Sequence, residues 1–505
     1  MIDIVAAMDD PALFGPWFQG ESWNAWRAIL KGAFALPMSG EERAFFRTVA
    51  ERDPPAKRVR ELWIVAGRRA GKDSLASVIA AHAASLFDQE HKLRPGERAL
   101  CLALACDRDQ AKIVLSYARS YFDDIALLSG MVTRRTASGF ELDNRVDVAV
   151  GTNSFRSVRG RPILLAVLDE VAFYRDETSA TPDEEVYRAI VPGMATLPGA
   201  MLIAISTPYR RAGLLYRKYR DHFGQDGDVL VIKAPSTLLN PTLDQAIIDR
   251  AMIEDPIAAS AEWMAEFRTD IESFVSREAI DAVTATGCRE RAPASGVRYF
   301  AFVDPSGGSS DSMTLAIAHR DADGDAVLSA IREWRPPFSP ESVVAESAAL
   351  LKAHGVHSVT GDRYAGEWPR ERFRVHGIAY ELSERTASDV FRDALPLLNS
   401  GRVVLLDHPR LIAQFCALER TTSRAGKDTI SHPPRGHDDL AVSAAGALLA
   451  AADQPSFVVT PELLARAQMM PSSRPLFARR RGFIPPVESQ CMPDSALPLD
   501  KRGQQ

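Results

Sequence analysis

Apolar runs alternate with amphipathic stretches through most of the 505-residue chain. Between about residues 60 and 234, short apolar runs such as Leu62–Ala66 and Leu164–Leu168 predict buried strands, and the stretches between them have helical spacing. Further strands are expected at 102–105, 146–150, 201–205 and 229–233. Strands that alternate with helices are typical of a parallel sheet covered on both faces. We therefore expect an α/β domain over residues 56–235.

A second α/β pattern covers residues 296–452 and begins differently. Three strands, expected at 299–303, 313–318 and 326–331, precede the first long helix, and helices and strands alternate only after it. The last helix of this region is expected to begin near Asp438. Because the two patterns differ, we expect two unlike domains and no internal repeat.

Three segments lie outside these two domains: an N-terminal segment, a linker between the domains and a C-terminal tail. Residues 1–55 are rich in Phe and Trp, with helical spacing between Trp23 and Phe34, which predicts a helical segment packed on the next domain. Residues 236–295 lack the apolar runs of strands and are expected to be a helical linker. Residues 453–505 are rich in proline, which predicts a partly disordered tail.

Composition and charge narrow the class of protein. With 46% hydrophobic and 25% charged residues, the chain has the composition of a soluble globular protein. It has neither an apolar run long enough to cross a membrane nor a signal-peptide pattern at its N-terminus, so we expect a cytoplasmic protein without a membrane partner. A net charge of −6 argues against a wholly basic nucleic-acid coat but allows local basic patches.

The turn after the strand at 62–66 has the pattern of a phosphate-binding loop. Its sequence is Ala66-Gly67-Arg68-Arg69-Ala70-Gly71-Lys72-Asp73-Ser74, between a strand and a helix. Such a loop forms an anion cradle, and we expect Lys72 to bind the β- and γ-phosphates of ATP. Ala66 replaces the usual first glycine, and Asp73 replaces the Ser or Thr that holds Mg²⁺. Either Asp73 or Ser74 could take over that ligand role; a weakened ATP site and a turn without a ligand are the alternatives.

Two later strand ends complete a candidate ATPase site. The strand at 164–168 ends in Asp169-Glu170, and ATP hydrolysis needs one carboxylate for Mg²⁺ (Asp169) and one that orients the attacking water (Glu170). The strand at 201–205 ends in Ser206-Thr207-Pro208, a small polar turn that in helicase-like motors couples loss of the γ-phosphate to DNA movement. Each feature alone is common at strand ends. Together, in this order in one domain, they favour ATP hydrolysis.

Acidic residues of the second domain stand where a nuclease needs them. Asp304 follows the first strand, Asp362 follows the fourth, and Asp438 and Asp439 begin the final helix. Ribonuclease-H-like nucleases have this layout, in which converging carboxylates hold two Mg²⁺ or Mn²⁺ ions about 4 Å apart. We expect all four to be metal ligands, and Asp304, Asp362 and Asp438 to be catalytic. Each acid alone is equally consistent with a solvated strand end or, at Asp438, a helix cap.

The order of these motifs resembles the large subunit of tailed-phage terminases over about residues 60–450. The matching positions are Gly67-Arg68-Arg69-Ala70-Gly71-Lys72, Ser157-Val158-Arg159-Gly160, Leu168-Asp169-Glu170, Ser206-Thr207-Pro208, Glu262-Trp263, Glu266-Phe267, Asp304, Asp362 and His437-Asp438-Asp439-Leu440. The resemblance implies an additional-strand P-loop ATPase domain followed by an RNase-H-like nuclease domain. The implied cofactors are ATP with one Mg²⁺, and two Mg²⁺ or Mn²⁺ ions in the nuclease. Arg68 or Arg69 would sense the γ-phosphate.

The resemblance also implies a biological setting. A terminase large subunit moves double-stranded viral DNA into a procapsid and cuts the concatemer in the host cytoplasm, without remaining in the finished virion. The implied partners are double-stranded DNA, a small terminase subunit and a portal protein. We expect a pentamer on the portal and a monomer in solution.

Two other functions remain open. A repair or recombination helicase-nuclease would need helicase arginine motifs in a second RecA-like domain, which we do not find. An ATPase-defective prophage remnant that acts as a DNA-binding scaffold is favoured only by Ala66 and Asp73. The candidate DNA contacts are basic clusters, most of which are expected to be solvated faces because phosphate contacts must converge: Arg134-Arg135, Arg156, Arg159, Arg161, Arg210-Arg211, Arg217-Lys218 and Arg479–Arg481.

Overall fold

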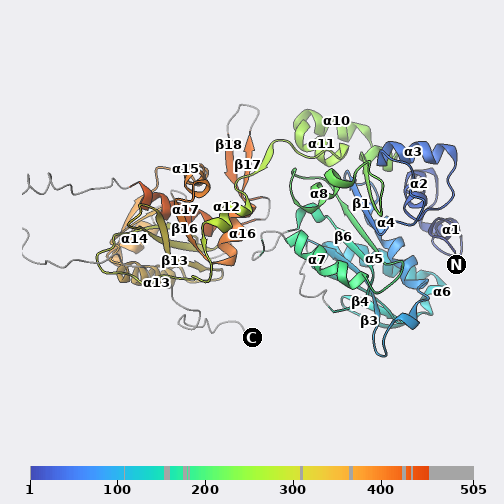
Figure 1. Cartoon of the computed structure of the whole chain (residues 1–505), viewed down its shortest axis with the longest axis horizontal. Coiled ribbons are helices and arrows are strands. Elements are labelled where there is room, and N and C mark those ends of the chain that lie inside the picture. Colours follow the sequence, from blue (N-terminus) through green and yellow to red (C-terminus); the bar gives the residue numbers. More distant parts are fainter. Residues whose placement is uncertain are drawn as a thin grey trace, which may run out of the picture. The chain divides into compact units, whose positions relative to one another are not determined.

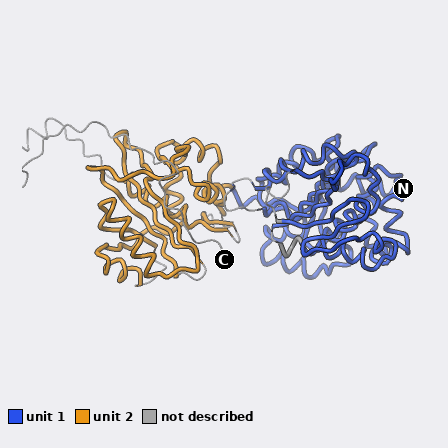
Figure 2. Tube along the Cα trace, turned by 90° about the horizontal axis from the view of Figure 1, so that it is seen from below, with its two compact units in different colours: residues 1–272 blue, residues 273–505 orange. Residues whose placement is uncertain are grey.

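The computed structural model describes residues 2–106, 108–152, 160–174, 179, 182–307, 311–362, 368–422, 428–433 and 436–453. The chain divides into two compact units, residues 1–272 and 273–505, which Figure 1 shows by element and Figure 2 by colour. Among the described helices, none is both long and apolar enough to span a membrane. The Ser157–Arg159 motif, Arg156 and the tail from residue 454 lie outside the described residues.

Unit 1 is built on an eight-stranded sheet with the order β3-β4-β5-β2-β6-β7-β1-β8. The strands are β1 (Glu61–Ala66), β2 (Ala99–Ala105), β3 (Val132–Thr136), β4 (Gly139–Leu142), β5 (Val146–Thr152), β6 (Ile163–Asp169), β7 (Met201–Ser206) and β8 (Val229–Ala234). From β5 to β8 all pairs are parallel. All seven residues of β6 are buried, as expected for a strand covered on both faces.

Helices cover both faces of this sheet. They are α1 (Ile4–Asp9), α2 (Asn24–Ala33), α3 (Gly40–Ala50), α4 (Lys72–Ser85), α5 (Arg108–Asp124), α6 (Ala126–Ser129), α7 (Pro182–Met194) and α8 (Gly213–His222), with single 3₁₀ turns at Gly15–Trp17, Glu21–Trp23, Glu90–Lys92 and Val171–Phe173. Right-handed crossovers place α4 and α5 on one face, because β1, β2 and β5 follow one another in one direction across the sheet. The connections through α7 and α8 run in the other direction and so lie on the opposite face.

The strand order confirms the additional-strand type of P-loop domain. Strand β7 lies between β1, which leads into the phosphate-binding loop, and β6, which ends in Asp169. The antiparallel hairpin β3–β4 was not expected, and it makes the sheet mixed. The sequence did not predict this hairpin because β3 is an exposed edge strand. Its central residues, including Arg134 and Arg135, are polar and give no apolar run.

The segment 236–295 is not the strand-free linker that its sequence predicted. Helices α9 (Ser236–Leu239), α10 (Gln245–Glu254) and α11 (Pro256–Met264) belong to unit 1, whereas α12 (Arg277–Ala282) belongs to unit 2. The segment also contains two short strands, β9 (Ile271–Ser273) and β10 (Thr284–Ala285). Strands of two or three residues are too short to show a period.

Unit 2 contains a seven-stranded sheet with the order β10-β16-β13-β12-β11-β14-β15. Its further strands are β11 (Tyr299–Asp304), β12 (Met313–Arg320), β13 (Ala326–Trp334), β14 (Ser358–Gly361), β15 (Ala379–Leu382) and β16 (Val403–Leu406). The first three pair antiparallel in sequence order, and β14 and β15 then add in parallel to the β11 side. This is the strand arrangement expected for an RNase-H-like domain. A separate three-stranded sheet, β18-β17-β9, includes β17 (Glu419–Thr422) and β18 (Asp428–Ser431).

Two helical layers cover the central sheet of unit 2. Its helices are α13 (Pro340–Ala353), α14 (Trp368–Val375), α15 (Ala387–Asn399), α16 (Pro409–Ala417) and α17 (Asp439–Ala452). Alternate residues of β11 enter different cores: Phe302 packs with α15, α16 and α17, whereas Ala301 and Val303 pack with α13 and α14. The side chain of Asp304 therefore belongs to the face that α17 covers.

Candidate active sites

The phosphate-binding loop has the backbone that its sequence requires. Gly71 precedes α4 with φ +86°, a conformation that L side chains rarely adopt. A Cβ at Gly67 would lie 2.1 Å from Ser236 Oγ, so only glycine fits there. Ala66, in place of the usual glycine, is the last residue of β1 and stays in regular register with Ala234 of β8. This departure from the motif therefore causes no strain.

Elements outside the β1–α4 unit fix the carbonyl groups of the loop. Ser236 Oγ donates to the carbonyl of Arg68 (2.7 Å), and Asn240 Nδ2 donates to that of Arg69 (2.9 Å). From the N-terminal helices, Trp26 Nε1 donates to the carbonyl of Ala70 (2.8 Å). Three consecutive carbonyls are thus bound by side chains of α2 and of the segment after β8, which holds the loop in place without a ligand.

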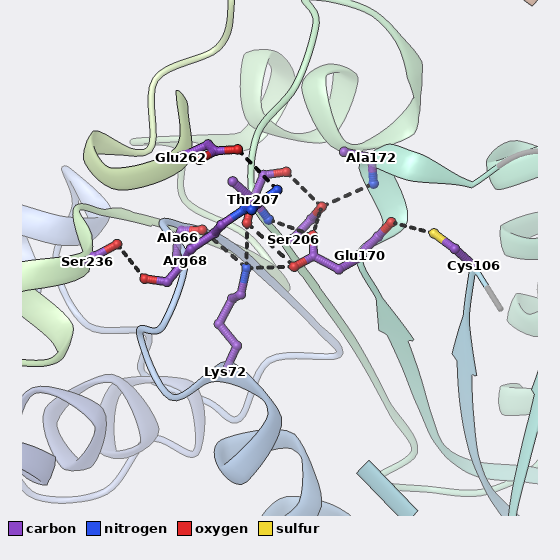
Figure 3. A network of polar contacts seen from close by, with 10 residues as sticks. All are labelled: Ala66, Arg68, Lys72, Cys106, Glu170, Ala172, Ser206, Thr207, Ser236 and Glu262. Carbon is purple, nitrogen blue, oxygen red and sulfur yellow. Dashed lines mark hydrogen bonds and ion pairs between the residues drawn. The ribbon is translucent and has the colours of Figure 1, made fainter. Parts of the chain in front are cut away.

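Lys72 connects the three motifs of the site (Figure 3). Its ammonium is buried and donates to Glu170 Oε1 (3.0 Å), to Thr207 Oγ1 (2.9 Å) and to the carbonyl of Ala66 (3.4 Å). Because the ends of β1, β6 and β7 meet at one edge of the sheet, residues far apart in sequence converge here. All three motifs lie next to the strands after which the sequence predicted them, but the sequence did not predict the ion pair between Lys72 and Glu170.

Glu170 is held in one orientation by the end of β7. Its Oε2 accepts hydrogen bonds from Thr207 N (3.0 Å) and from Ser206 Oγ (3.1 Å). Its backbone is left-handed (φ +49°), a conformation that costs a non-glycine residue about 1–2 kcal/mol. Pro208, the third residue of the proposed coupling turn, is buried directly after them. Ser206 and Thr207 thus touch the carboxylate to which we assign water activation.

Two largely buried carboxylates beside Lys72 form a candidate Mg²⁺ site. Burial, together with Asp73 and Glu170, raises the pKa of Asp169 to about 8, and burial also raises the pKa of Asp73. Asp169 Oδ1 is buried and has no hydrogen-bond partner in the described part of the chain. Hard carboxylate oxygens with unmet charge suit Mg²⁺, so Asp73 and Asp169 fit the metal that accompanies ATP. Ser74 lies in the same first turn of α4.

The two loop arginines have different environments. The Arg68 guanidinium pairs with Glu262 Oε1 on α11 (3.1 Å), and the Arg68 N–H donates to the carbonyl of Glu262 (2.6 Å). Arg69 is exposed, has φ +60° and acts electrostatically on Asp73. Of the two, Arg69 has the side chain that is free to reach a phosphate at the loop.

The second candidate site lies at one edge of the unit 2 sheet. The parallel pairs Phe302–Thr360 and Val303–Gly361 bring the next residues, Asp304 and Asp362, to neighbouring positions. Asp438 and Asp439 arrive from the N-terminus of α17, which packs across β11, β12 and β13. The fold thus brings all four predicted acids to one edge.

The electrostatics of these acids reflect their proximity. Burial raises the pKa of Asp304 well above its ordinary value, with further contributions from Asp439, Asp362 and Asp438. Burial and Asp438 raise the pKa of Asp439 to about 6. Its Oδ2 is buried, has no hydrogen-bond partner among the described residues and lies 4.0 Å from His437 Nδ1. Asp438 takes the cap position of α17, yet its side chain makes no capping hydrogen bond. A capping role therefore does not explain Asp438.

Metal ions fit this cluster, although the ligand set is not preformed. Within the described residues, no three His, Cys, Asp or Glu side chains stand close enough together to hold a metal ion. Four repelling carboxylates without a cation are expected to keep apart. The Asp439 carboxylate, whose Oδ2 has only His437 Nδ1 nearby at 4.0 Å, and the largely buried Asp304 carboxylate are nonetheless the hard oxygen donors that Mg²⁺ or Mn²⁺ binds.

Sequence reasoning missed the residues that support the acids. Thr314 Oγ1 donates to the carbonyl of Asp439 (2.8 Å), and Gln414 Oε1 accepts from the N–H of Ala441 (3.0 Å), so β12 and α16 fix the start of α17. Tyr380 Oη donates to the carbonyl of Asp362 (3.1 Å). A Cβ at Gly361 would lie 2.2 Å from Tyr380 Oη, so the glycine admits the tyrosine. These are ordinary residue types whose role appears only in three dimensions.

Most of the described basic clusters are already paired with acids. Arg134 pairs with Glu141 (3.1 Å), Arg135 with Asp123 (2.5 Å) and Lys218 with Glu61 (2.7 Å). Arg161 and Arg217 also pair, with Asp147 and Glu184. These pairs weaken the case for the clusters as DNA contacts.

Comparison with known proteins gives matches among solved structures alone. No family model and no curated protein sequence matches the chain. The large terminase of bacteriophage HK97 is 18% identical with a TM-score of 0.34, covering 86% of this chain and 100% of that chain. The large terminase of a thermophilic bacteriophage is 11% identical with a TM-score of 0.37, covering 86% and 99%. The large terminase nuclease of another thermophilic phage, G20c, is 20% identical with a TM-score of 0.30, covering 35% and 96%. These three solved structures are large terminases or a large terminase nuclease, and the motifs of this chain resemble the same family.

Proposed function

We propose that this protein is the large subunit of a phage or prophage terminase, an ATP-driven DNA motor that is also a metal-dependent endonuclease. One observation carries the proposal: a phosphate-binding site and a separate cluster of acids lie in two different units of one chain. A motor-nuclease needs both sites, whereas a simple ATPase or a simple nuclease needs one of them.

The residues of unit 1 have distinct roles in ATP hydrolysis. Lys72 binds the β- and γ-phosphates, and Asp73 and Asp169 hold the Mg²⁺ of the nucleotide. Glu170 orients the attacking water, and its contacts with Ser206 and Thr207 transmit loss of the γ-phosphate to β7. When bound, Mg²⁺ neutralises phosphate charge. Phosphates would also compete with Glu170 for Lys72, which would free the carboxylate for water.

In unit 2, Asp304, Asp362, Asp438 and Asp439 would hold two Mg²⁺ or Mn²⁺ ions. When bound, the ions would activate water for attack and would stabilise charge on the leaving oxygen of a phosphodiester. Asp304, the most buried of the acids, sets the position of the site through β11, while Thr314 and Gln414 fix the start of α17. The substrate is double-stranded DNA, cut by hydrolysis.

The remaining assignments follow from this function. We propose a small terminase subunit and a portal protein as partners, a pentamer on the portal and a monomer in solution. Action in the host cytoplasm, without incorporation into the virion, belongs to the same proposal.

The alternatives have less support. A helicase-nuclease would need a second RecA-like domain, but the central sheet of unit 2 contains the three consecutive antiparallel strands β11, β12 and β13. A scaffold without ATPase activity was favoured by Ala66 and Asp73. However, Ala66 fits without strain, and Asp73 lies beside Asp169 as a candidate metal ligand.

Two variants test the proposal by affecting one site each. In wild-type protein we expect DNA-stimulated ATP hydrolysis, and conversion of supercoiled plasmid to linear fragments with Mg²⁺ or Mn²⁺. Lys72→Ala should abolish ATP turnover and leave cutting measurable, whereas Asp362→Asn should abolish cutting and leave ATP turnover. Wild-type protein that is folded but does neither, in either metal, would reject the proposal and favour the scaffold. Loss of both activities in each variant would mean that the sites are not separate.

A further inference from the structure

A groove in unit 2 is connected to Asp362 through Tyr380, and it is lined by residues that no motif identified. It has a volume of about 540 Å³ between α14 and β15, and its lining includes Arg370, Glu371, Arg374 and Tyr380. Strand β15 is the outermost strand of the sheet next to β14, which leads into Asp362. The groove therefore lies along the outer strand of the sheet, where Ala379 and Tyr380 pair with Ser358 and Val359 of β14. Figure 1 labels α14, the helix that forms its other wall.

Tyr380 joins the groove to the acidic cluster. Its ring is buried against Phe373 of α14, with ring centroids 5.7 Å apart, and its hydroxyl donates to the carbonyl of Asp362. Burial, Asp362 and Asp304 raise the pKa of the Tyr380 hydroxyl, whereas Arg370 lowers it. One side chain thus has the nuclease acids and the arginine of the groove as its charged neighbours.

The two arginines are available to a ligand. Arg370 and Arg374 lie one turn apart on α14, flank the buried Phe373 and are exposed. Among the described residues no carboxylate forms an ion pair with either, whereas Arg372 and His376 of the same region both pair with Glu341. Residues at i and i+4 on a helix have Cβ atoms about 5–6 Å apart, so both guanidinium groups can bind one extended anion.

We propose that Arg370 and Arg374 bind the phosphate backbone of the DNA strand whose phosphodiester is presented to Asp304 and Asp362. This inference rests on the proposed nuclease function and adds a substrate-binding site to it. Four acids repel a polyanion, so a DNA strand needs cationic contacts close to them. The groove supplies two such contacts and is connected to Asp362 by Tyr380, and the single acid among its described lining residues, Glu371, leaves a net positive charge. Guanidinium groups are suited to phosphate because they donate two hydrogen bonds in one plane.

The test compares plasmid cutting by the full chain with Mn²⁺ and without ATP, so that only the nuclease site is read. Relative to wild type, Arg370→Ala/Arg374→Ala should raise KM for DNA at least roughly tenfold, and by more than it lowers kcat. The slope of log KM against log salt should fall by about 1.8, the value for two lost phosphate contacts. Arg370→Lys/Arg374→Lys should recover most of that slope, because it restores the charge.

A matched control removes the same charge elsewhere on unit 2. Arg277 and Arg392 are also exposed, but they pair with Asp281 and Asp389 on α12 and α15. Arg277→Ala/Arg392→Ala should leave KM and its salt slope near those of wild type. An equal loss in this control, or an unchanged KM in the groove variant, would overturn the inference while leaving the nuclease assignment intact. A wild-type chain that does not cut DNA would instead reject the proposed function itself.

Discussion

Glu170 belongs to one motif of the candidate ATP site and forms hydrogen bonds with residues of the other two. One carboxylate oxygen accepts from Lys72, and the other accepts from Ser206 and Thr207 at the end of β7. Its left-handed backbone stores a small strain, as residues at functional sites often do. If Lys72 exchanges Glu170 for another partner, the hydrogen bonds of Glu170 with Ser206 and Thr207 at the end of β7 are expected to change as well.

The first prediction concerns the charge of this side chain. Glu170→Gln keeps an oxygen that accepts from Thr207 and Ser206, but it lacks the charge that activates water. We expect kcat for ATP hydrolysis to fall by about 10²–10⁴, with Mg·ATP binding retained or tighter because Lys72 is no longer paired. Steady-state turnover and calorimetric titration with Mg·ATP measure both effects. Glu266→Gln, an exposed glutamate that pairs with Lys233, is the control. Turnover within twofold of wild type in Glu170→Gln would move the catalytic role to another residue.

At the scale of elements, the phosphate-binding loop depends on segments outside the α/β core. The aromatic helix α2 contributes Trp26, and the segment after β8 contributes Ser236, Asn240 and Glu262. These contacts give a structural reason for the aromatic N-terminal region. They also link the loop to the segment that leads into unit 2.

Trp26→Phe tests this link. The substitution leaves the buried carbonyl of Ala70 without its donor, which costs about 1–3 kcal/mol. We expect a lower Tm and weaker Mg·ATP binding, because the loop loses one of its three carbonyl anchors. In the control Trp17→Phe, the lost indole packs edge-on against Tyr121 and does not touch the loop. If both variants bind Mg·ATP equally well, Trp26 has only a packing role.

The sequence was most informative where a regular apolar run is followed by residues with a recognisable chemical role. The apolar runs placed β1, β6 and β7 within one or two residues, and their polar ends identified Lys72, Asp169 and Thr207. It could not identify contacts such as Trp26 with Ala70 or Tyr380 with Asp362, because the partners are far apart in the chain and of common types. The exposed edge strand β3 and the two-residue strand β10 were missed because they bury too little to show a pattern.

At the scale of the whole molecule, the acidic cluster imposes a stability cost on unit 2. Asp304 is buried among three other carboxylates, and its pKa lies well above that of an unfolded chain. A carboxyl group with a raised pKa binds more protons when folded than when unfolded. Its effect therefore lowers stability as pH rises from the ordinary value of about 4 toward the folded pKa. Asp439, with a pKa of about 6, adds to this effect.

Removal of one of these charges should therefore stabilise the metal-free protein. We expect Asp304→Asn to raise Tm at pH 8 without metal by about 2–4 °C, on the order of 1 kcal/mol, and to have less effect at pH 5. Mg²⁺ should raise the Tm of wild type at pH 8 but that of the variant less, because the metal relieves the same repulsion. Calorimetric unfolding of both proteins measures Tm in these three conditions. As a control, Asp393→Asn should show neither effect. Asp393 is an exposed acid of α15 that pairs with Arg385. A metal-free Asp304→Asn that melts below wild type at pH 8 would mean that Asp304 is stabilising. The acidic cluster would then be a stabilising structural network, and not a metal site whose carboxylates repel one another when no metal is bound.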